Sequence, residues 1–118
     1  MPLIKLMKLL IVDDIPQVRQ VLRTVVLDLA DEVFECDDGT RALDVYMAQQ
    51  PDWVLMDIQM NEVDGLIATR QIKAAFPDAK VIIVTNYDDV ALRAAAEQSG
   101  ACGYVVKENL LDVCRMLA

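Results

Sequence analysis

Short apolar runs alternate with helical patterns along the whole chain, and this alternation limits the fold more than any other feature. Five runs have the length and composition of strands, at residues 8–12, 32–36, 53–57, 80–84 and 103–106. After each run the apolar residues take helical spacing, at about residues 16–29, 40–49, 66–76, 89–98 and 110–117. We therefore predict an α/β fold in which right-handed crossovers join the strands of one parallel sheet, with helices on both faces.

Proline, glycine and asparagine mark several helix boundaries. Pro16 suits the first turn of the first helix, and Pro51 follows the second. The pair Ser99-Gly100 ends the fourth helix, and Asn109 is expected to cap the short last helix.

Size and charge limit the function of the chain. With 118 residues and 55% hydrophobic content, it suits one compact domain that buries roughly two-thirds of the surface of the unfolded chain. A net charge of −8 disfavours nucleic acid and acidic membranes as direct partners. Residues 1–8 have the positive charge of a signal peptide, but their apolar runs are short and no small-residue cleavage site follows. We expect a cytoplasmic protein without a membrane span.

The cysteines give little support to a disulfide framework or a zinc site. Cys36, Cys102 and Cys114 are odd in number and form no Cys-x-x-Cys pair. We expect buried, reduced thiols.

The most continuous apolar run, residues 53–56, stops at Asp57. Such a run is typical of a strand in the middle of a parallel sheet, buried on both faces. Ligands of open α/β sheets bind at the carboxyl ends of the strands, which makes Asp57 a candidate site residue. An aspartate that only caps a strand has the same pattern.

Polar side chains also follow three other predicted strands: Asp13 and Asp14 the first, Thr85 the fourth and Lys107 the fifth. Because these strand ends share one edge of a parallel sheet, we expect the side chains to lie in one crevice with Asp57. Each also has a simpler explanation. The two aspartates could cap the first helix, Thr85 could be an ordinary β-branched strand residue, and Lys107 could be a solvated charge.

Three carboxylates in one crevice require counterions. Two like charges about 5 Å apart repel by roughly 3 kcal/mol at an effective dielectric constant of about 20. Lys107 supplies one positive charge, and a divalent cation would supply two. Oxygen ligands without His or Cys favour Mg²⁺, with Mn²⁺ as the alternative, and a hydroxyl and an ammonium beside the cation would hold phosphoryl oxygens. The chain contains no histidine, so a phosphohistidine donor would be another molecule.

Taken together, these motifs resemble the receiver domains of two-component response regulators. The resemblance rests on residues 9–14 (Leu-Leu-Ile-Val-Asp-Asp), Met56-Asp57, Asp64-Gly65, Val84-Thr85 and residues 103–107 (Gly-Tyr-Val-Val-Lys). It covers essentially the whole chain and implies a (βα)5 flavodoxin-like fold, doubly wound, with sheet order 2-1-3-4-5. It also implies one receiver domain over residues 1–118, with a core at about 7–118 and no output domain.

The resemblance assigns the acidic residues to metal binding and phosphoryl transfer. Asp57 would accept the phosphoryl group, so the chain would catalyse its own phosphorylation and dephosphorylation without turning over an external substrate. Asp14 would bind Mg²⁺ directly and Asp13 mainly through water, with Asp57 and the backbone carbonyl of Gln59 as further ligands.

The same resemblance predicts a switch and an output surface. Thr85 and Lys107 would hold phosphoryl oxygens. Tyr104 would be an aromatic switch, with a simply packed aromatic as the alternative. We expect the output surface on the fourth helix, the fifth strand and the last helix, where Leu111 and Met116 do not all fit inward.

The implied partners are other proteins. A sensor histidine kinase or a histidine phosphotransfer protein would supply the phosphoryl group. An output domain or a separate output protein would receive the signal, and a homodimer is a further alternative. Neither direct nucleic-acid binding nor membrane binding is expected of this domain.

Three positions depart from the usual pattern of such receivers. Asn61 replaces a proline, which predicts a more mobile loop after the acceptor. Asn86 stands where a small residue is usual, and its side chain could narrow access to Asp57 or hydrogen-bond a phosphoryl oxygen. Glu108 replaces the common proline after Lys107, which leaves either peptide isomer open. The Lys107-Glu108 pair also resembles receivers that are joined to helix-turn-helix output domains.

Two other function classes compete with this interpretation. A haloacid-dehalogenase-like phosphatase would need Asp-x-Asp after the acceptor strand, and the sequence has Asp57-Ile58-Gln59 instead. A receiver-like binding module that works without phosphorylation stays open. Flavin binding is disfavoured, because acidic residues replace a phosphate-binding loop after the first strand.

Overall fold

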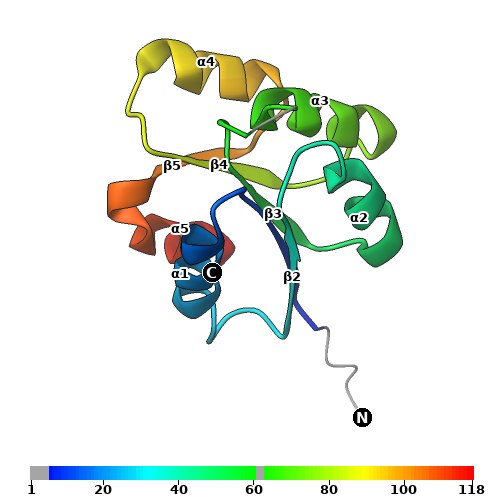
Figure 1. Ribbon diagram of the computed structural model, residues 1–118, viewed down its shortest axis with the longest axis vertical. Coiled ribbons are helices and arrows are strands. Elements are labelled where there is room, and N and C mark those ends of the chain that lie inside the picture. Colours follow the sequence, from blue (N-terminus) through cyan, green and yellow to red (C-terminus); the bar gives the residue numbers. More distant parts are fainter. Residues whose placement is uncertain (1–5, 61–62) are drawn as a thin grey trace.

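The computed structural model describes residues 6–60 and 63–118, which form a five-stranded parallel sheet flanked by helices (Figure 1). The strands are β1 (Lys8–Val12), β2 (Glu32–Cys36), β3 (Trp53–Met56), β4 (Val81–Thr85) and β5 (Gly103–Val106), in the order β2-β1-β3-β4-β5. The helices are α1 (Pro16–Val25), α2 (Ala42–Gln49), α3 (Gly65–Ala75), α4 (Val90–Gln98) and α5 (Leu111–Leu117), with the 3₁₀ helix η1 (Lys107–Asn109) before α5. The predicted flavodoxin-like fold and its strand order are confirmed.

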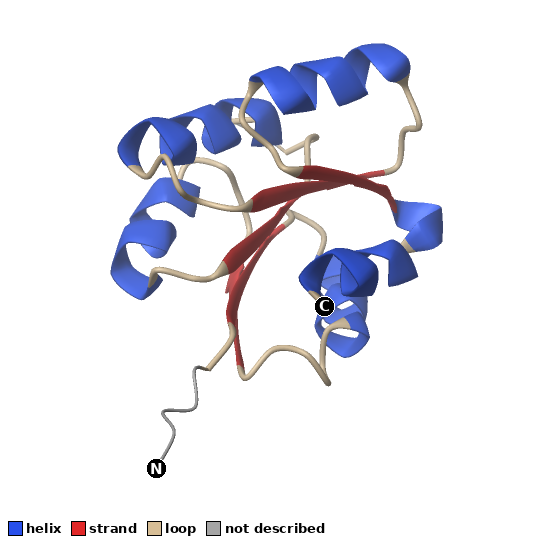
Figure 2. Ribbon diagram, turned by 180° about the vertical axis from the view of Figure 1, so that it is seen from behind, coloured by secondary structure: helices blue, strands red, loops and turns tan. Residues whose placement is uncertain are grey.

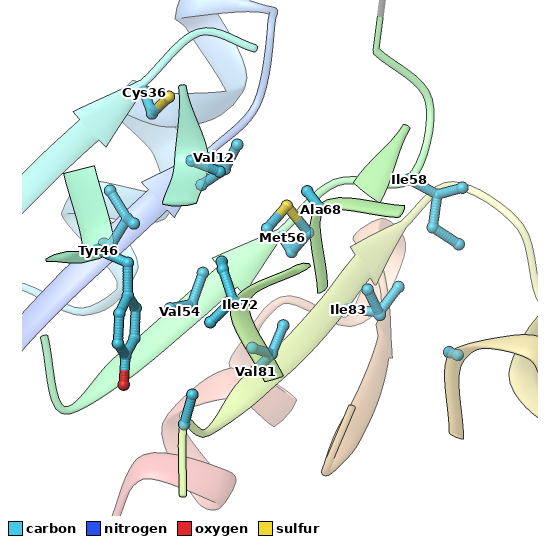
Figure 3. Packing of buried hydrophobic residues seen from close by; sticks show 14 residues of the cluster. Val12, Cys36, Tyr46, Val54, Met56, Ile58, Ala68, Ile72, Val81 and Ile83 are labelled. Atoms are coloured by element: carbon cyan, nitrogen blue, oxygen red, sulfur yellow. The ribbon is translucent and has the colours of Figure 1, made fainter. Parts of the chain in front are cut away.

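Helices cover both faces of the sheet, α1 and α5 on one and α2, α3 and α4 on the other (Figure 2). Side chains alternate along each strand, so Leu9 and Ile11 of β1 pack in the core under α1 and α5, whereas Leu10 and Val12 pack in the other core. Figure 3 shows the second core, with Val12 and Ile72 of α3 among its members. Burial on both faces explains why the strands are continuous apolar runs in the sequence.

Two helix boundaries differ from the prediction. Helix α1 ends at Val25 instead of residue 29, because the chain continues in tighter turns in which the Leu29 N–H donates to the Val26 carbonyl at 2.9 Å. The predicted cap at Asn109 is wrong. This residue is part of η1, and α5 begins after Leu110, where no side chain caps the helix.

The three cysteines are free thiols, but they are not uniformly buried. Cys36 is buried and Cys114 is partly buried, whereas Cys102 is exposed, which makes the prediction of a buried thiol wrong there. Cys102 lies just before β5, and within residues 6–60 and 63–118 no further strand pairs with this edge of the sheet.

Two questions that the sequence left open concern the Lys107–Glu108 peptide bond and the loop at Asn61. None of the peptide bonds in residues 6–60 and 63–118 is cis, so the Lys107–Glu108 bond is trans. The loop position Asn61 lies outside the described residues. Among the helices that the structure describes, none is long and apolar enough to cross a membrane.

Candidate functional site

Strand pairing brings the candidate site residues to one edge of the sheet. Val12 of β1 pairs with Met56 of β3, so Asp13 and Asp57 follow directly on neighbouring strands. On the other side, β4 lies between β3 and β5 (Figure 1). The carboxyl ends of all these strands therefore meet, as the parallel topology predicts.

The acidic residues and the lysine form one buried cluster. Asp13, Asp14 and Asp57 each place a carboxylate oxygen within 4.8 Å of the others. The Lys107 ammonium lies 3.0 Å from Asp13 Oδ2 and 3.3 Å from Asp57 Oδ1. Asp13 and Asp57 are 1% and 5% exposed. The structure thus contradicts both the solvated Lys107 and a helix-capping role for the aspartates, since the N-cap of α1 is Ile15 and no side chain caps it.

Three of the four polar atoms of Asp13 form hydrogen bonds. Its N–H donates to the Cys36 carbonyl at 3.1 Å, and its Oδ1 accepts from the Ile15 N–H at 2.9 Å. Its own carbonyl accepts from the Arg19 guanidinium at 2.6 Å. The remaining oxygen, Oδ2, is buried and has no hydrogen bond, since its contact with Lys107 is an ion pair without hydrogen-bond geometry.

This arrangement fits a divalent cation. Three carboxylates and one ammonium leave about two negative charges uncompensated in a buried site. Asp13 Oδ2 has an ion pair with Lys107 but no hydrogen bond, and a buried carboxylate oxygen without a hydrogen bond is costly, so a cation would be a favourable further partner. All the ligating atoms on offer are hard oxygens, which suit Mg²⁺.

The acidity of Asp57 reflects its surroundings. Burial first, and repulsion by Asp13 next, raise the pKa of Asp57 from 3.8 to about 6, and Asp14 adds a smaller increase. Lys107 opposes this shift by Coulomb attraction and a hydrogen bond. A bound cation would act in the same direction as Lys107 and favour the ionised carboxylate.

A glycine fixes how the chain leaves the acceptor strand. A Cβ on Gly65 would lie 1.8 Å from the backbone carbonyl oxygen of Asp57, so only glycine allows the start of α3 to approach this closely. The Gly65 N–H donates to the Ile58 carbonyl at 2.8 Å, and Asp64 caps α3 by accepting from the Ile67 N–H at 2.9 Å. The Asp64-Gly65 motif thus holds the start of α3 against Asp57 and Ile58, next to the exposed Gln59.

Thr85 ends β4, and Asn86 follows it directly. Thr85 is buried, and its hydroxyl accepts a long hydrogen bond of 3.4 Å from the Tyr87 N–H. Asn86 is exposed and lines, with Lys107, a pocket of about 270 Å³ between the end of the sheet and α1. Its other walls are Gln17, Val18, Val21 and Leu110.

Tyr104 lies apart from the acidic cluster, on β5. Its hydroxyl donates to the backbone carbonyl of Tyr87, and the Arg93 guanidinium lies over its ring, 4.5 Å from the centroid. The partly buried ring also packs against the core under α3 and α4. This side chain therefore ties β5 to the loop between β4 and α4.

Sequence reasoning missed Arg19 and Glu35. Arg19 of α1 contacts the main chain of Asp13 and also donates to Glu35 of β2 at 2.9 Å. The only signal in the sequence is the i, i+4 spacing of Arg19 and Arg23, which places both arginines on one face of α1.

Comparisons with known proteins agree on one family. A profile of the response regulator receiver domain matches residues 9–116. The chemotaxis protein CheY of Listeria monocytogenes is 39% identical over 108 residues, which cover 91% of each chain. The oxygen regulatory protein NreC of Staphylococcus carnosus is 38% identical over 117 residues, which cover 92% of this chain and 54% of that protein.

Solved structures agree as well. The crystal structure of a two-component response regulator of the LuxR family from Aurantimonas sp. SI85-9A1 matches with a TM-score of 0.85 and 28% identity, over 96% of this chain and 86% of that one. NreC is a longer protein than this chain, and the chain spans about half of its length.

Proposed function

The chain belongs to the response regulator receiver domains of two-component systems, and from this we propose that Asp57 accepts a phosphoryl group with the help of Mg²⁺. One observation carries the proposal. The buried Asp57 carboxylate lies in a cluster with Asp13, Asp14 and Lys107, and a divalent cation would balance the two negative charges that Lys107 leaves uncompensated.

The chemistry is positioning and charge neutralisation. An Asp57 oxygen attacks phosphorus in line, a new O–P bond forms, and the bond from phosphorus to the donor nitrogen breaks. The electron pair of that bond leaves with the donor imidazole, which takes up a proton. Lys107 stabilises the oxygens of the phosphoryl group, and Thr85 holds another of them. Asp14, Asp57 and the Gln59 carbonyl would hold Mg²⁺ directly and Asp13 mainly through water, and the cation would supply the remaining positive charge.

The donor is another molecule, because the chain has no histidine. We propose a sensor histidine kinase or a histidine phosphotransfer protein for this role. Relatives such as NreC are about twice as long as the matched region, so the output comes from a domain beyond this region or from a separate protein.

We place the output surface on α4, β5 and α5. Phosphorylation adds negative charge next to Thr85, whose hydroxyl is only weakly held, and Tyr104 joins the following loop to β5. On this face Leu111 is 71% exposed and Met116 is 37% exposed. A groove of about 510 Å³ lies beside Tyr104, between α4 and the start of β5.

The first experiment is intact mass spectrometry after incubation with a small-molecule phosphodonor. The wild type should gain one phosphoryl group only with Mg²⁺, and Asp57→Ala should gain none. Asp44→Ala, which removes an exposed carboxylate of α2, is the matched control and should behave as the wild type. No adduct on the wild type, with Mg²⁺ binding measured separately, would favour a binding module that works without phosphorylation.

The output surface is tested by two substitutions on it. Tyr104→Ala and Leu111→Glu should weaken dimerisation or partner binding of the phosphorylated protein, measured by sedimentation or titration. If both variants bind as the wild type does, the output surface lies elsewhere.

A further inference from the structure

We propose that Arg19 is a positioning residue for the metal site, and that Glu35 holds it in place from the neighbouring strand. Arg19 acts on the peptide between Asp13 and Asp14, so that both carboxylates are oriented before a cation arrives. The inference rests on the proposed Mg²⁺ site and adds to it a residue outside the acidic cluster.

Arg19 connects directly to the main chain of the site. Its Nη1 donates to the backbone carbonyl of Asp13 at 2.6 Å, and its side chain is only 16% exposed. That carbonyl belongs to the peptide unit that leads into Asp14. A rotation of this peptide would turn the Asp14 side chain away from Asp13 and Asp57, so the guanidinium restrains the relative direction of two candidate ligands.

The rest of Asp13 is fixed by other groups. Its N–H is bonded to the Cys36 carbonyl and its Oδ1 to the Ile15 N–H, at 3.1 and 2.9 Å. Arg19 is the only side chain among the described residues that bonds its carbonyl. With these three restraints in place, Oδ2, which has an ion pair with Lys107 but no hydrogen bond, stays pointed at the cluster.

Glu35 holds the guanidinium from β2. It lies beside Ile11 in the pairing of β1 with β2, and Ile11 is two residues before Asp13, which directly follows β1. Its Oε1 accepts from Arg19 Nε at 2.9 Å and its Oε2 from Arg23. Burial raises the pKa of Glu35, but hydrogen bonds from Arg23 and Arg19 outweigh it and leave the pKa lowered, so the carboxylate is charged at neutral pH.

Arg23 offers a matched control. It donates to Glu35 Oε2 at 2.9 Å and to the Val33 carbonyl at 3.3 Å, and among the described residues it makes no hydrogen bond to Asp13. Replacing either arginine removes one positive charge from α1 and one ion pair with Glu35. Only the Arg19 substitution also releases the Asp13 carbonyl.

The experiment is a Mg²⁺ titration by calorimetry on the wild type, Arg19→Met and Arg23→Met, with thermal unfolding in the absence of metal. We expect the dissociation constant to rise about tenfold for Arg19→Met, as for other residues that orient metal ligands, and to change less than about twofold for Arg23→Met. Loss of a nearby positive charge alone would strengthen cation binding, so weaker binding cannot be a charge effect. Arg19→Lys, which keeps a charged donor, should recover part of the affinity.

The outcomes separate this inference from the proposed function. Wild type that binds no Mg²⁺ would overturn both. Wild type that binds Mg²⁺ while Arg19→Met binds equally well would overturn only the role of Arg19, as would equal weakening by Arg19→Met and Arg23→Met. If Arg19→Met does not fold, Arg19→Lys and Arg23→Met carry the comparison, and equal affinities in these two variants and the wild type would contradict the inference.

Discussion

The two halves of the site are built differently. We call Asp13, Asp14, Asp57 and Lys107 the acidic end, and Thr85, Asn86, Tyr87 and Tyr104 the hydroxyl end. At the acidic end, Asp13 and Asp57 are 1% and 5% exposed, and Lys107 joins them at 3.0 and 3.3 Å. At the hydroxyl end, residues 86–90 are all exposed, and the buried Thr85 hydroxyl has one hydrogen bond, of 3.4 Å.

This difference separates chemistry from response. Phosphoryl transfer needs charges that are already in place, because reorganising buried charges during the reaction is costly. A conformational response needs a segment that rearranges at low cost, and segments with few buried contacts have low local stability. The acidic end suits the first task and the loop after β4 suits the second. Four substitutions test this division, taken from the largest expected effect to the smallest.

Gly65→Ala should be the most damaging, because the new Cβ would lie 1.8 Å from the Asp57 carbonyl oxygen, a backbone atom that cannot move away alone. We expect a loss of roughly 4 kcal/mol in the free energy of unfolding, measured by urea denaturation, at the upper end of single substitutions. Gly100→Ala is the control. Gly100 has φ +101° and its Cβ would meet the flexible Lys73 side chain at 2.8 Å, so about 1–2 kcal/mol is expected. Equal losses would show that the acidic end is not unusually rigid.

Asp57→Asn should change how stability depends on pH. The pKa of Asp57 is raised from 3.8 to about 6, so between these values the folded metal-free protein holds more protons than the unfolded chain. Its stability should therefore fall by about 3 kcal/mol as the pH rises from 4 to 6 and beyond, and Asp57→Asn should remove this loss. Urea unfolding in a chelator across this range gives the slope. If Asp57→Asn and the wild type have the same slope, the pKa of Asp57 is not raised in the folded protein without metal.

Tyr104→Phe should have a moderate effect confined to the hydroxyl end. It removes the hydrogen bond from the Tyr104 hydroxyl to the Tyr87 carbonyl, worth about 1 kcal/mol. Amide hydrogen exchange of residues 86–89 should become faster, while the affinity for Mg²⁺ stays within about twofold of the wild type. A larger change in Mg²⁺ affinity would contradict the separation of the two ends.

Arg93→Met should have the smallest effect on stability. The Arg93 side chain is 45% exposed, and its ring contact with Tyr104 and its ion pair with Asp88 together contribute about 0.5–1 kcal/mol. Burial raises the pKa of Tyr104 and Arg93 opposes this, so removing Arg93 should raise that pKa further. Absorbance titration of the tyrosines measures this. If the pKa of Tyr104 does not change, the Arg93 guanidinium does not lie over the Tyr104 ring in solution.

The sequence predicted the parts of the site that depend on strand order. Asp57 and Lys107 each follow a continuous apolar run. Because the carboxyl ends of parallel strands lie at the same edge of the sheet, both residues must lie at that edge. The sheet order itself came from resemblance, because periodicity does not distinguish which strands are neighbours.

Other features depend on side-chain geometry that no local pattern encodes. The contact of Arg19 with the Asp13 carbonyl requires the angle at which α1 crosses the sheet and one particular rotamer. The capping prediction at Asn109 failed because the chain after Lys107 first takes a tighter 3₁₀ turn, which asparagine does not forbid. The exposure of Cys102 follows from the edge position of β5, which is a property of the whole sheet.

Strand β3 also determines what spectroscopy can report. Its last residue precedes Asp57, and its first residue is Trp53, the only tryptophan of the chain. Four residues of extended strand place the Cα atoms of Trp53 and Asp57 about 13 Å apart, and the Lys80 ammonium lies 4.9 Å from the indole ring centroid. Tryptophan emission should therefore change when the sheet unfolds but not when a cation binds or Asp57 is phosphorylated. The same fluorescence signal can then measure the stability of this receiver with and without a bound cation or phosphoryl group.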